Sequence, residues 1–146
     1  MPASKSYDAA TKEMLKKRPD AKRGLRLLRR AHAAGDARAA YALATWHLFG
    51  VHDIEKDYRR AAELLMEAAK QNIPEALYDL AVSYEKGAGI RKSERKAYHL
   101  YVRAALWGDK QAIYEVGRCL FYGIGAKRDR RLADVWLARA EALGVS

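Results

Sequence analysis

The stretch Tyr84-Glu85-Lys86-Gly87-Ala88-Gly89-Ile90 decides the fold, because its aromatic residue, two glycines and aliphatic residue recur at a fixed distance. The same device returns 36 residues later as Leu120-Phe121-Tyr122-Gly123-Ile124-Gly125-Ala126. It also occurs 37 residues earlier as His47-Leu48-Phe49-Gly50, where the second glycine is missing. A period of about 30 to 40 residues built from paired helical segments indicates a solenoid, in which each unit buries its apolar face against its neighbours. The sequence therefore predicts an all-helical repeat fold.

The composition permits one domain with a sizeable core and no covalent cross-links, since 50% of the 146 residues are apolar or aromatic. Cys119 is the one cysteine, so the chain can form neither an intramolecular disulfide nor a multi-cysteine metal site. Residues 1–7 contain no apolar signal-peptide core, and no later stretch approaches the roughly 18 apolar residues of a membrane span. We therefore expect a soluble cytoplasmic protein without a membrane partner.

The formal net charge of +10 is concentrated near the N-terminus. Residues 1–30 hold ten Lys or Arg against three acids, which gives +7 and leaves +3 for the other 116 residues. Such a patch favours an acidic protein surface, a nucleic acid or an anionic membrane, although a solvated helix face also carries charge runs. The charge by itself leaves these alternatives open.

The apolar periodicity predicts about eight helices. Residues 6–17 read as an amphipathic helix, and the break at Arg18-Pro19-Asp20 makes residues 1–19 an N-terminal capping helix. Residues 20–144 then hold three helix pairs and a closing helix, within a single domain that covers residues 1–146. The first helices of the units span residues 20–34, 57–71, 93–107 and 129–143, and the second helices span residues 36–49, 74–86 and 109–122.

The aligned units keep the same residue sizes at the same columns. The small columns of the first helices are Gly24, Ala61, Ala97, Ala133 and Ala31, Ala68, Ala104, Ala140. The bulky columns between them are Leu27, Leu64, Leu100, Trp136 and Leu28, Leu65, Tyr101, Leu137. In the second helices the core columns are Ala39, Ala76, Ala112, then Tyr41, Tyr78, Tyr114, then Leu43, Leu80, Val116. Small residues let helices approach closely, and bulky residues fill the space between them.

Helix ends are marked as clearly as helix faces. The first helices open at Asp20, Asp57, Ser93 and Asp129, whose side chains accept hydrogen bonds from unpaired backbone N–H groups. They end at Gly35, Asn72, Gly108 and Gly144, the residue types that a left-handed C-terminal cap requires. Pro74 suits the first turn of a second helix, where its missing N–H is not needed.

These repeated residues resemble the Sel1-like repeat, a relative of the tetratricopeptide repeat. The resemblance is carried by Ala68, Ala69, Asn72, Ala76, Tyr78, Leu80, Ala81, Tyr84, Gly87, Gly89 and Ile90, and by the matching run Ala104, Ala105, Gly108, Ala112, Tyr114, Val116, Gly117, Gly123 and Gly125. It covers residues 20–144 and implies a right-handed α–α solenoid. Family members of this kind act mostly as adaptors, partners or inhibitors of other proteins. The resemblance therefore implies an interaction module, either an intracellular adaptor or a bacterial immunity protein that occupies a toxin.

Motifs that could carry chemistry have simpler explanations in the repeat. Gly87-x-Gly89 and Gly123-x-Gly125 follow helices rather than strands and lack the Lys-Ser or Lys-Thr of a phosphate loop. Ser93-x-x-Lys96 has the spacing of a serine acylase, but Ser93 aligns with two helix-capping aspartates. His47 and His52, with Glu55 nearby, are poorly spaced for a helical metal site. We expect no enzyme activity, cofactor or metal.

The face of the first helices opposite the small columns is the predicted binding surface. First helices line the concave side of tetratricopeptide-like solenoids, so we expect a groove with a basic margin and an apolar floor. The candidate partner-binding residues are Lys22, Arg26, Arg29, Arg59, Met66, Arg95, Tyr98, His99, Val102, Arg103, Arg131 and Val135. Such a groove suits a peptide or loop with acidic and apolar residues. The alternative is nucleic acid, above all RNA, bound by the basic N-terminal and concave surfaces, although most tyrosines fall in core columns rather than on a stacking surface.

Overall fold

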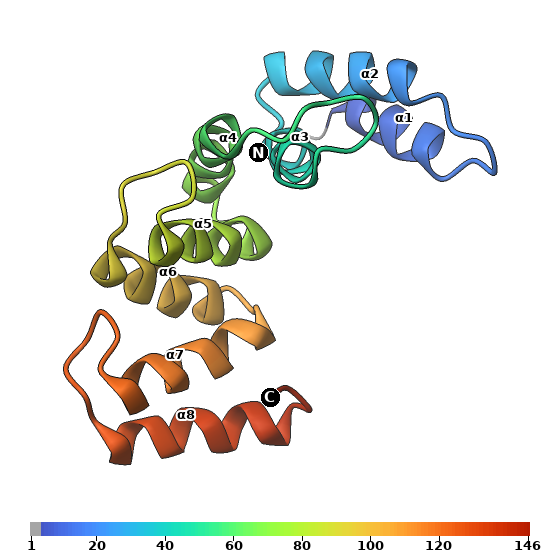
Figure 1. Ribbon diagram of the computed structural model, residues 1–146. Helices are drawn as coiled ribbons and strands as arrows, with labels where there is room; N and C mark the ends of the chain where they lie inside the picture. The colour runs from blue at the N-terminus through green and yellow to red at the C-terminus, as the bar shows by residue number, and fades with distance from the viewer. Residues whose placement is uncertain (1–3) are drawn as a thin grey trace. The chain divides into compact units, whose positions relative to one another are not determined.

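The computed structural model describes residues 4–146, and this part of the chain forms eight α-helices and no strand (Figure 1). The helices are α1 (Lys5–Met14), α2 (Ala21–Ala33), α3 (Ala37–Phe49), α4 (Tyr58–Lys70), α5 (Pro74–Lys86), α6 (Glu94–Leu106), α7 (Lys110–Tyr122) and α8 (Arg130–Ala142). The predicted all-helical repeat fold is confirmed.

Seven of the eight helices begin at a polar capping residue. The four predicted caps, Asp20, Asp57, Ser93 and Asp129, each accept a hydrogen bond from the backbone N–H three residues later, at 3.0 to 3.2 Å. Such a bond stabilises a helix by about 1 kcal/mol. The exception is α5, which follows Ile73 without a side-chain cap and has Pro74 in its first turn. Both predictions about helix starts are confirmed, and the Ser93 hydroxyl acts as a cap.

The α7–α8 loop has no room for a side chain at Gly125. Gly125 has a φ of 69°, and a Cβ atom built on it would lie 2.0 Å from the carbonyl oxygen of Glu94. The loop backbone therefore rests directly on the first turn of α6. Because Arg95 is the next residue of that turn, this contact holds the start of α6, which carries more of the predicted site residues than any other helix.

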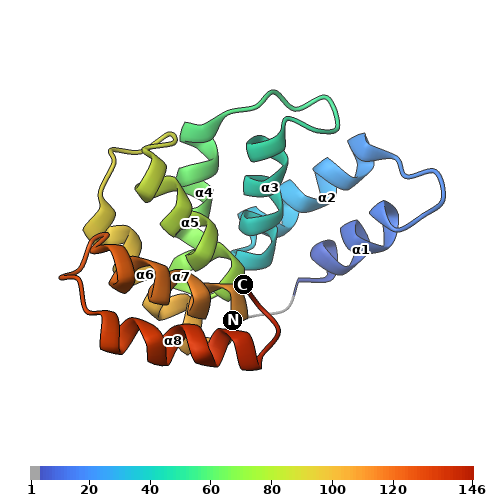
Figure 2. The ribbon, with the colours of Figure 1, turned by 60° about the horizontal axis from the view of Figure 1, so that its bottom comes forward.

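The chain divides into two compact units: unit 1 ends at Gln71 and contains α1 to α4, and unit 2 runs from Asn72 to Ser146 and contains α5 to α8. In unit 1 the closest packing joins α1 to α2 and α3 to α4, and in unit 2 it joins α5 to α6 and α7 to α8 (Figure 2). The packing of α2 on α3 and of α6 on α7 is less extensive. The sequence analysis had paired α2 with α3, α4 with α5, and α6 with α7. The most extensive packing instead joins each odd-numbered helix to the helix that follows it, beginning with α1 and α2.

The predicted small columns are all buried, from Gly24 in α2 to Ala140 in α8. A Cβ atom on Gly24 would lie 2.5 Å from the sulfur of Met14, so the missing side chain is what lets α1 pack on α2. The tyrosine column differs from expectation, because Tyr41, Tyr78 and Tyr114 are only half-buried. Their phenol rings reach the edge of the core, where a hydroxyl can find polar partners.

Candidate protein-interaction surface

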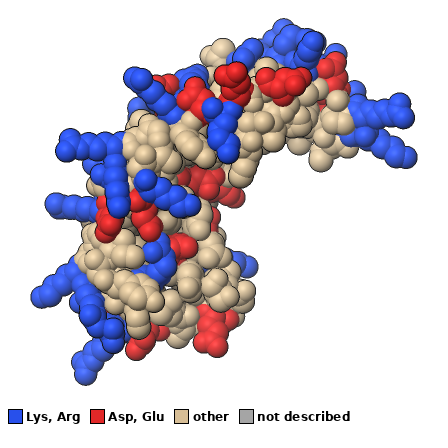
Figure 3. Space-filling model, in the orientation of Figure 1, with Lys and Arg blue, Asp and Glu red and all other residues tan. Residues whose placement is uncertain are grey.

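Four basic residues occupy the second position of α2, α4, α6 and α8, as the repeat predicts. They are Lys22, Arg59, Arg95 and Arg131, and all four are exposed. Within residues 4–146 none of their side chains makes an ion pair. In unit 2, Lys and Arg side chains project from the margin where α6 and α8 begin (Figure 3). A cation near a helix N-terminus opposes the helix dipole by about 0.3 to 1 kcal/mol, so helix stability does not account for this column.

The other candidates of unit 1 lie on α2 and α4. Arg26 and Arg29 are exposed on α2, which also presents Lys22, Arg23 and Arg30 to solvent. Met66 is exposed on α4, with 37% of its surface accessible. The basic residues of α2 thus form one charged helix face.

The candidates of unit 2 differ in accessibility. His99, Arg103, Arg131 and Val135 are exposed, whereas Tyr98 and Val102 are half-buried. Burial raises the pKa of the Tyr98 phenol, whose ring lies 5.7 Å from the ring of His99. The guanidinium of Arg103 donates a hydrogen bond of 3.0 Å to the side-chain oxygen of Asn72. The predicted apolar floor is therefore partly covered at Tyr98 and Val102 of α6, and it is open at Val135 of α8.

Val135 lines an apolar cleft between α6, α7 and α8 that the sequence did not fully predict. The cleft is lined by Ala105, Leu106, Ile113, Val135, Trp136 and Arg139. Leu106 and Val135 stand out from their columns, because the corresponding residues of the other units are mostly polar or small. That contrast in the sequence indicates an apolar surface at these two positions. Ile113, Trp136 and Arg139 become visible as cleft residues only once the helices are packed.

A polar network joins α5, α6 and α7, and sequence reasoning missed it. Arg118 donates to Glu85 at 2.7 Å and to Glu115 at 2.6 Å, and Tyr101 donates to Glu85 at 3.0 Å. Tyr78 donates to Glu115 at 3.4 Å, and burial followed by the nearby Glu115 charge raises the pKa of Tyr78 to about 12. Glu85 aligns with Leu48 and Phe121, and Arg118 aligns with Val82, so charges at apolar columns were the available signal.

Asp36 has a buried carboxylate that holds the start of α3 in unit 1. Its carboxylate accepts hydrogen bonds from the backbone of Ser4 at 3.1 Å, from the backbone of Arg38 at 3.0 Å and from the Arg38 guanidinium at 2.8 and 3.1 Å. Burial raises the pKa of this carboxyl, but the bonds from Arg38 outweigh burial, so the pKa lies below its ordinary value. Asp36 therefore serves structure rather than catalysis.

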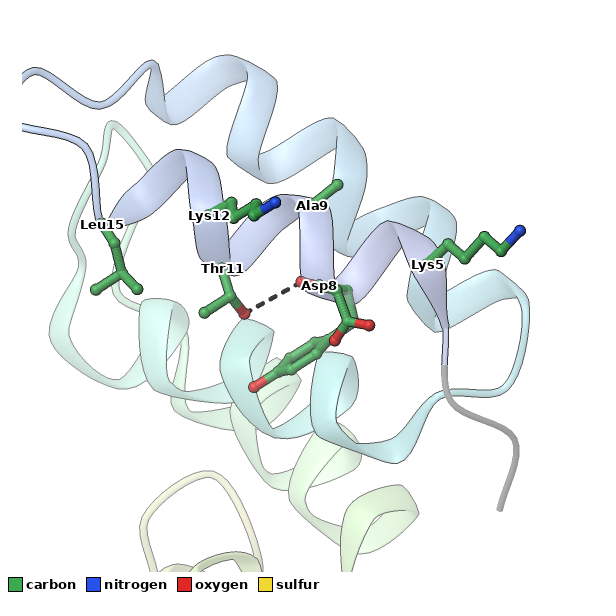
Figure 4. A pocket seen from close by; sticks show the side chains of 7 residues that line it. Lys5, Asp8, Ala9, Thr11, Lys12 and Leu15 are labelled. Carbon is green, nitrogen blue, oxygen red and sulfur yellow. Dashed lines mark hydrogen bonds between the residues drawn. The ribbon is translucent and has the colours of Figure 1, made fainter.

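Two further places lack the converging groups that a site needs. A hollow along α1 is lined by residues of that helix and its C-cap, among them Lys5, Asp8, Thr11 and Leu15 (Figure 4). No second element contributes to this lining. The His52 ring packs 4.5 Å from the Trp46 ring, and the described residues contain no group of three His, Cys, Asp or Glu side chains able to hold a metal ion.

Comparison with known proteins identifies the family. The Sel1 repeat matches this chain four times, at residues 14–36, 37–73, 74–109 and 110–145. The chain belongs to the Sel1 repeat family. Sel1 repeat proteins generally mediate protein–protein interactions. No curated protein sequence matches the chain. Among the described residues, every helix is too short or too polar to span a membrane.

Solved Sel1 repeat structures share this fold. The chain is 34% identical to a Sel1 repeat protein from Oxalobacter formigenes, with a TM-score of 0.74, and the match covers 84% of this chain and 91% of that one. It superposes with a TM-score of 0.89 and 24% identity on a protective antigen of uropathogenic Escherichia coli that displays an SLR fold, over 95% of this chain but only 30% of the antigen. Cysteine rich protein B of Helicobacter pylori gives a TM-score of 0.63 at 22% identity, over 82% of this chain and 90% of that one.

The Sel1 repeats are in phase with the observed helix pairs. In the repeats at residues 37–73, 74–109 and 110–145, helices α3, α5 and α7 come first and helices α4, α6 and α8 come second. Most candidate residues therefore lie on second helices of Sel1 repeats. The sequence analysis had placed these residues on the first helices of its repeats, because it began the repeats at α2, α4, α6 and α8.

Proposed function

We propose that this Sel1 repeat protein binds a partner protein without turnover, through exposed basic and apolar side chains on α2, α4, α6 and α8. The observation that carries the proposal is the column Lys22, Arg59, Arg95 and Arg131, which is exposed and makes no ion pair within residues 4–146. Each unit presents two of these cations, and exposed cations attract an acidic surface and speed its association. Exposed Met66 and Val135 offer apolar contacts beside them.

The proposed partner has acidic and apolar residues in one segment, and the proposed role is that of an adaptor or an inhibitor, such as an immunity protein that occupies a toxin. The same residues support both roles, because each requires a stoichiometric complex. We propose a cytoplasmic setting. Cys119 is fully buried, and burial raises the pKa of its thiol to about 12, so this thiol is protected from exchange and needs no oxidising compartment.

Nucleic acid is the second candidate, and the basic face of α2 supports it. Lys22, Arg23, Arg26, Arg29 and Arg30 are all exposed on this one helix. Binding of single strands also uses exposed aromatic rings. The large exposed aromatics of unit 1, Phe49 and Tyr58, lie on other helices, so a protein partner is favoured.

The deciding experiment purifies the natural partner from a native lysate and measures its binding to charge-reversed variants. The double variant Arg59→Glu with Arg95→Glu should reduce the association rate about tenfold at low salt and flatten its salt dependence. The control, Lys70→Glu with Lys110→Glu, changes the net charge equally at exposed positions outside the column. Equal effects of the two double variants would show that net charge, rather than this column, attracts the partner.

An apolar change separates the two candidate functions. Met66→Asp or Val135→Asp should increase the dissociation rate of a protein partner, because apolar contacts act mainly after docking. A nucleic-acid partner should respond to the arginine changes and not to the apolar ones. Recovery of nuclease-sensitive RNA as the sole partner would overturn the proposal.

A further inference from the structure

The apolar cleft of unit 2 has the composition of a docking site. It has a volume of about 260 Å³ between the end of α6, the first turns of α7 and the middle of α8. Five of its six lining residues are apolar, and the sixth is Arg139. Leu106 and Val135 at its edge are 75% and 66% exposed. Large aliphatic side chains with such exposure on neighbouring helices leave apolar surface in water, which is unfavourable unless a partner covers it.

The equivalent place in unit 1 shows that the repeat does not require an open apolar cleft. The repeat alignment matches Ala105 with His32, and Arg139 with Glu67. In unit 1 the His32 ring nitrogen lies 2.5 Å from the Glu67 carboxylate, so a polar contact joins α2 to α4 there. The positions of Leu106 and Val135 are occupied in unit 1 by Ala33 and Glu63. Unit 2 thus replaces a bridged polar groove with an open apolar one.

Arg139 gives the cleft its electrostatic preference. Its side chain is exposed, and no carboxylate of residues 4–146 pairs with it. An arginine at the margin of an apolar cleft favours a carboxylate on whatever fills the cleft. A second copy of this chain is a poor occupant, because each copy carries a net charge of +10. A free small molecule is also disfavoured, since the cleft is smaller than the roughly 300 to 1,000 Å³ typical of such sites.

We propose that this cleft binds a short segment of a partner protein, which inserts one large apolar side chain between Leu106 and Val135 and pairs an Asp or Glu with Arg139. The inference rests on the proposed function and assigns it a specific contact. The volume of about 260 Å³ suits an anchoring side chain with its immediate neighbours. The anchor covers the apolar surface of α6 and α8, and the carboxylate selects the direction in which the segment lies.

A displayed library of random peptides about twelve residues long tests the proposal directly. Selection on the wild-type chain should enrich peptides with a large aliphatic or aromatic residue and an Asp or Glu within about four positions. The enriched peptides should bind at least about tenfold more weakly to Val135→Asp and to Arg139→Glu. Exchanging their acidic residue for Lys should restore binding to Arg139→Glu and weaken binding to wild type.

Two matched controls lie on the same helix. Leu132→Asp and Arg130→Glu introduce the same acidic side chains at exposed positions of α8 outside both the cleft lining and the basic column, and should alter peptide binding less than about twofold. Circular dichroism of each variant confirms that α8 remains folded. All four positions are exposed, so each variant should fold.

The proposal is overturned if no enriched peptide depends on both Val135 and Arg139, or if the controls weaken binding as much. Peptides that lose binding on Arg59→Glu with Arg95→Glu and ignore the cleft variants would refute the cleft while leaving the proposed function standing. Natural-partner binding that ignores the arginine column, with cleft-dependent peptides present, would refute the column while leaving the cleft standing. A dimer in sedimentation that Val135→Asp dissociates would place a second copy in the cleft and refute the peptide assignment.

Discussion

The α7–α8 loop offers a substitution whose effect can be worked out from the structure. Gly125→Ala adds one methyl group that would lie 2.0 Å from the Glu94 carbonyl oxygen and 3.0 Å from the Arg95 backbone nitrogen. These are backbone atoms in the first turn of α6, so no side chain can swing aside. Either the loop or the helix terminus must move. Gly123→Ala, in the same loop, is the matched control, because its φ of 75° is close to the 69° of Gly125 while its nearest neighbour lies at 3.3 Å.

The two substitutions share one free-energy term and differ in a second. A non-glycine residue in the left-handed region costs about 1 to 2 kcal/mol at either position. Overpacking against atoms that cannot yield adds about 1 to 3 kcal/mol at Gly125. We therefore expect Gly125→Ala to lower the free energy of unfolding by about 2 to 5 kcal/mol. For Gly123→Ala we expect a loss of about 1 to 2 kcal/mol.

Urea unfolding followed by far-ultraviolet circular dichroism measures both values. Hydrogen exchange of the Lys96 and Ala97 amides, which donate to Ser93 at the start of α6, provides a local readout, because protection there should fall in Gly125→Ala and not in Gly123→Ala. Equal destabilisation by the two variants would refute the close contact, since only the shared left-handed strain would then be present. Any loss of partner binding that accompanies Gly125→Ala should follow the displacement of Arg95.

Two further predictions concern charges that sequence reasoning missed. Arg118→Met should lower the free energy of unfolding by about 2 kcal/mol, because Glu85 and Glu115 would lose the cation that bridges them. Arg118→Lys should lower the free energy of unfolding by less. An Arg118→Met variant as stable as wild type in urea would contradict the network. Asp36→Asn should be less stable than wild type at neutral pH by about 2 kcal/mol. The folded-state pKa of Asp36 lies below the ordinary value of 3.8, so its contribution is present above that pH and is lost as pH falls through the folded-state pKa. Urea unfolding should therefore show the Asp36→Asn difference closing in acid, and Asp8→Asn, at an exposed carboxylate, should show a much smaller difference at any pH.

Helix boundaries were predictable because their causes are local. Asp20, Asp57, Ser93 and Asp129 cap their helices through a bond that spans three residues, and Pro74 needs no distant partner to open α5. Glycine or asparagine at the helix ends follows from backbone conformation in the same way. The residues that determine each helix boundary lie within a single turn of it, so the sequence alone predicts the boundaries.

Charged positions at the edge of the core were less predictable. The alignment places Tyr78 and Tyr114 in one column, yet Tyr78 donates to Glu115 from the neighbouring helix pair. Arg118 joins two carboxylates 33 residues and three residues away, on α5 and on its own helix. An alignment of the repeats shows what equivalent positions have in common. Such a network depends instead on which residue of the next repeat faces each position.

The sequence by itself determined the helices, their caps and the Sel1 family, because the same local signals for helix start, helix end and buried face recur in every repeat. The pairing of the helices was decided only by tertiary packing. A periodic chain reads equally well whether α2 pairs with α1 or with α3, and the extent of side-chain burial between helices breaks that symmetry. The same packing brings Leu106 of α6 and Val135 of α8 to one cleft and leaves their side chains exposed. Exposure of an apolar residue depends on what its neighbours fail to cover, and those neighbours are set by the arrangement of helices rather than by the pattern within one helix.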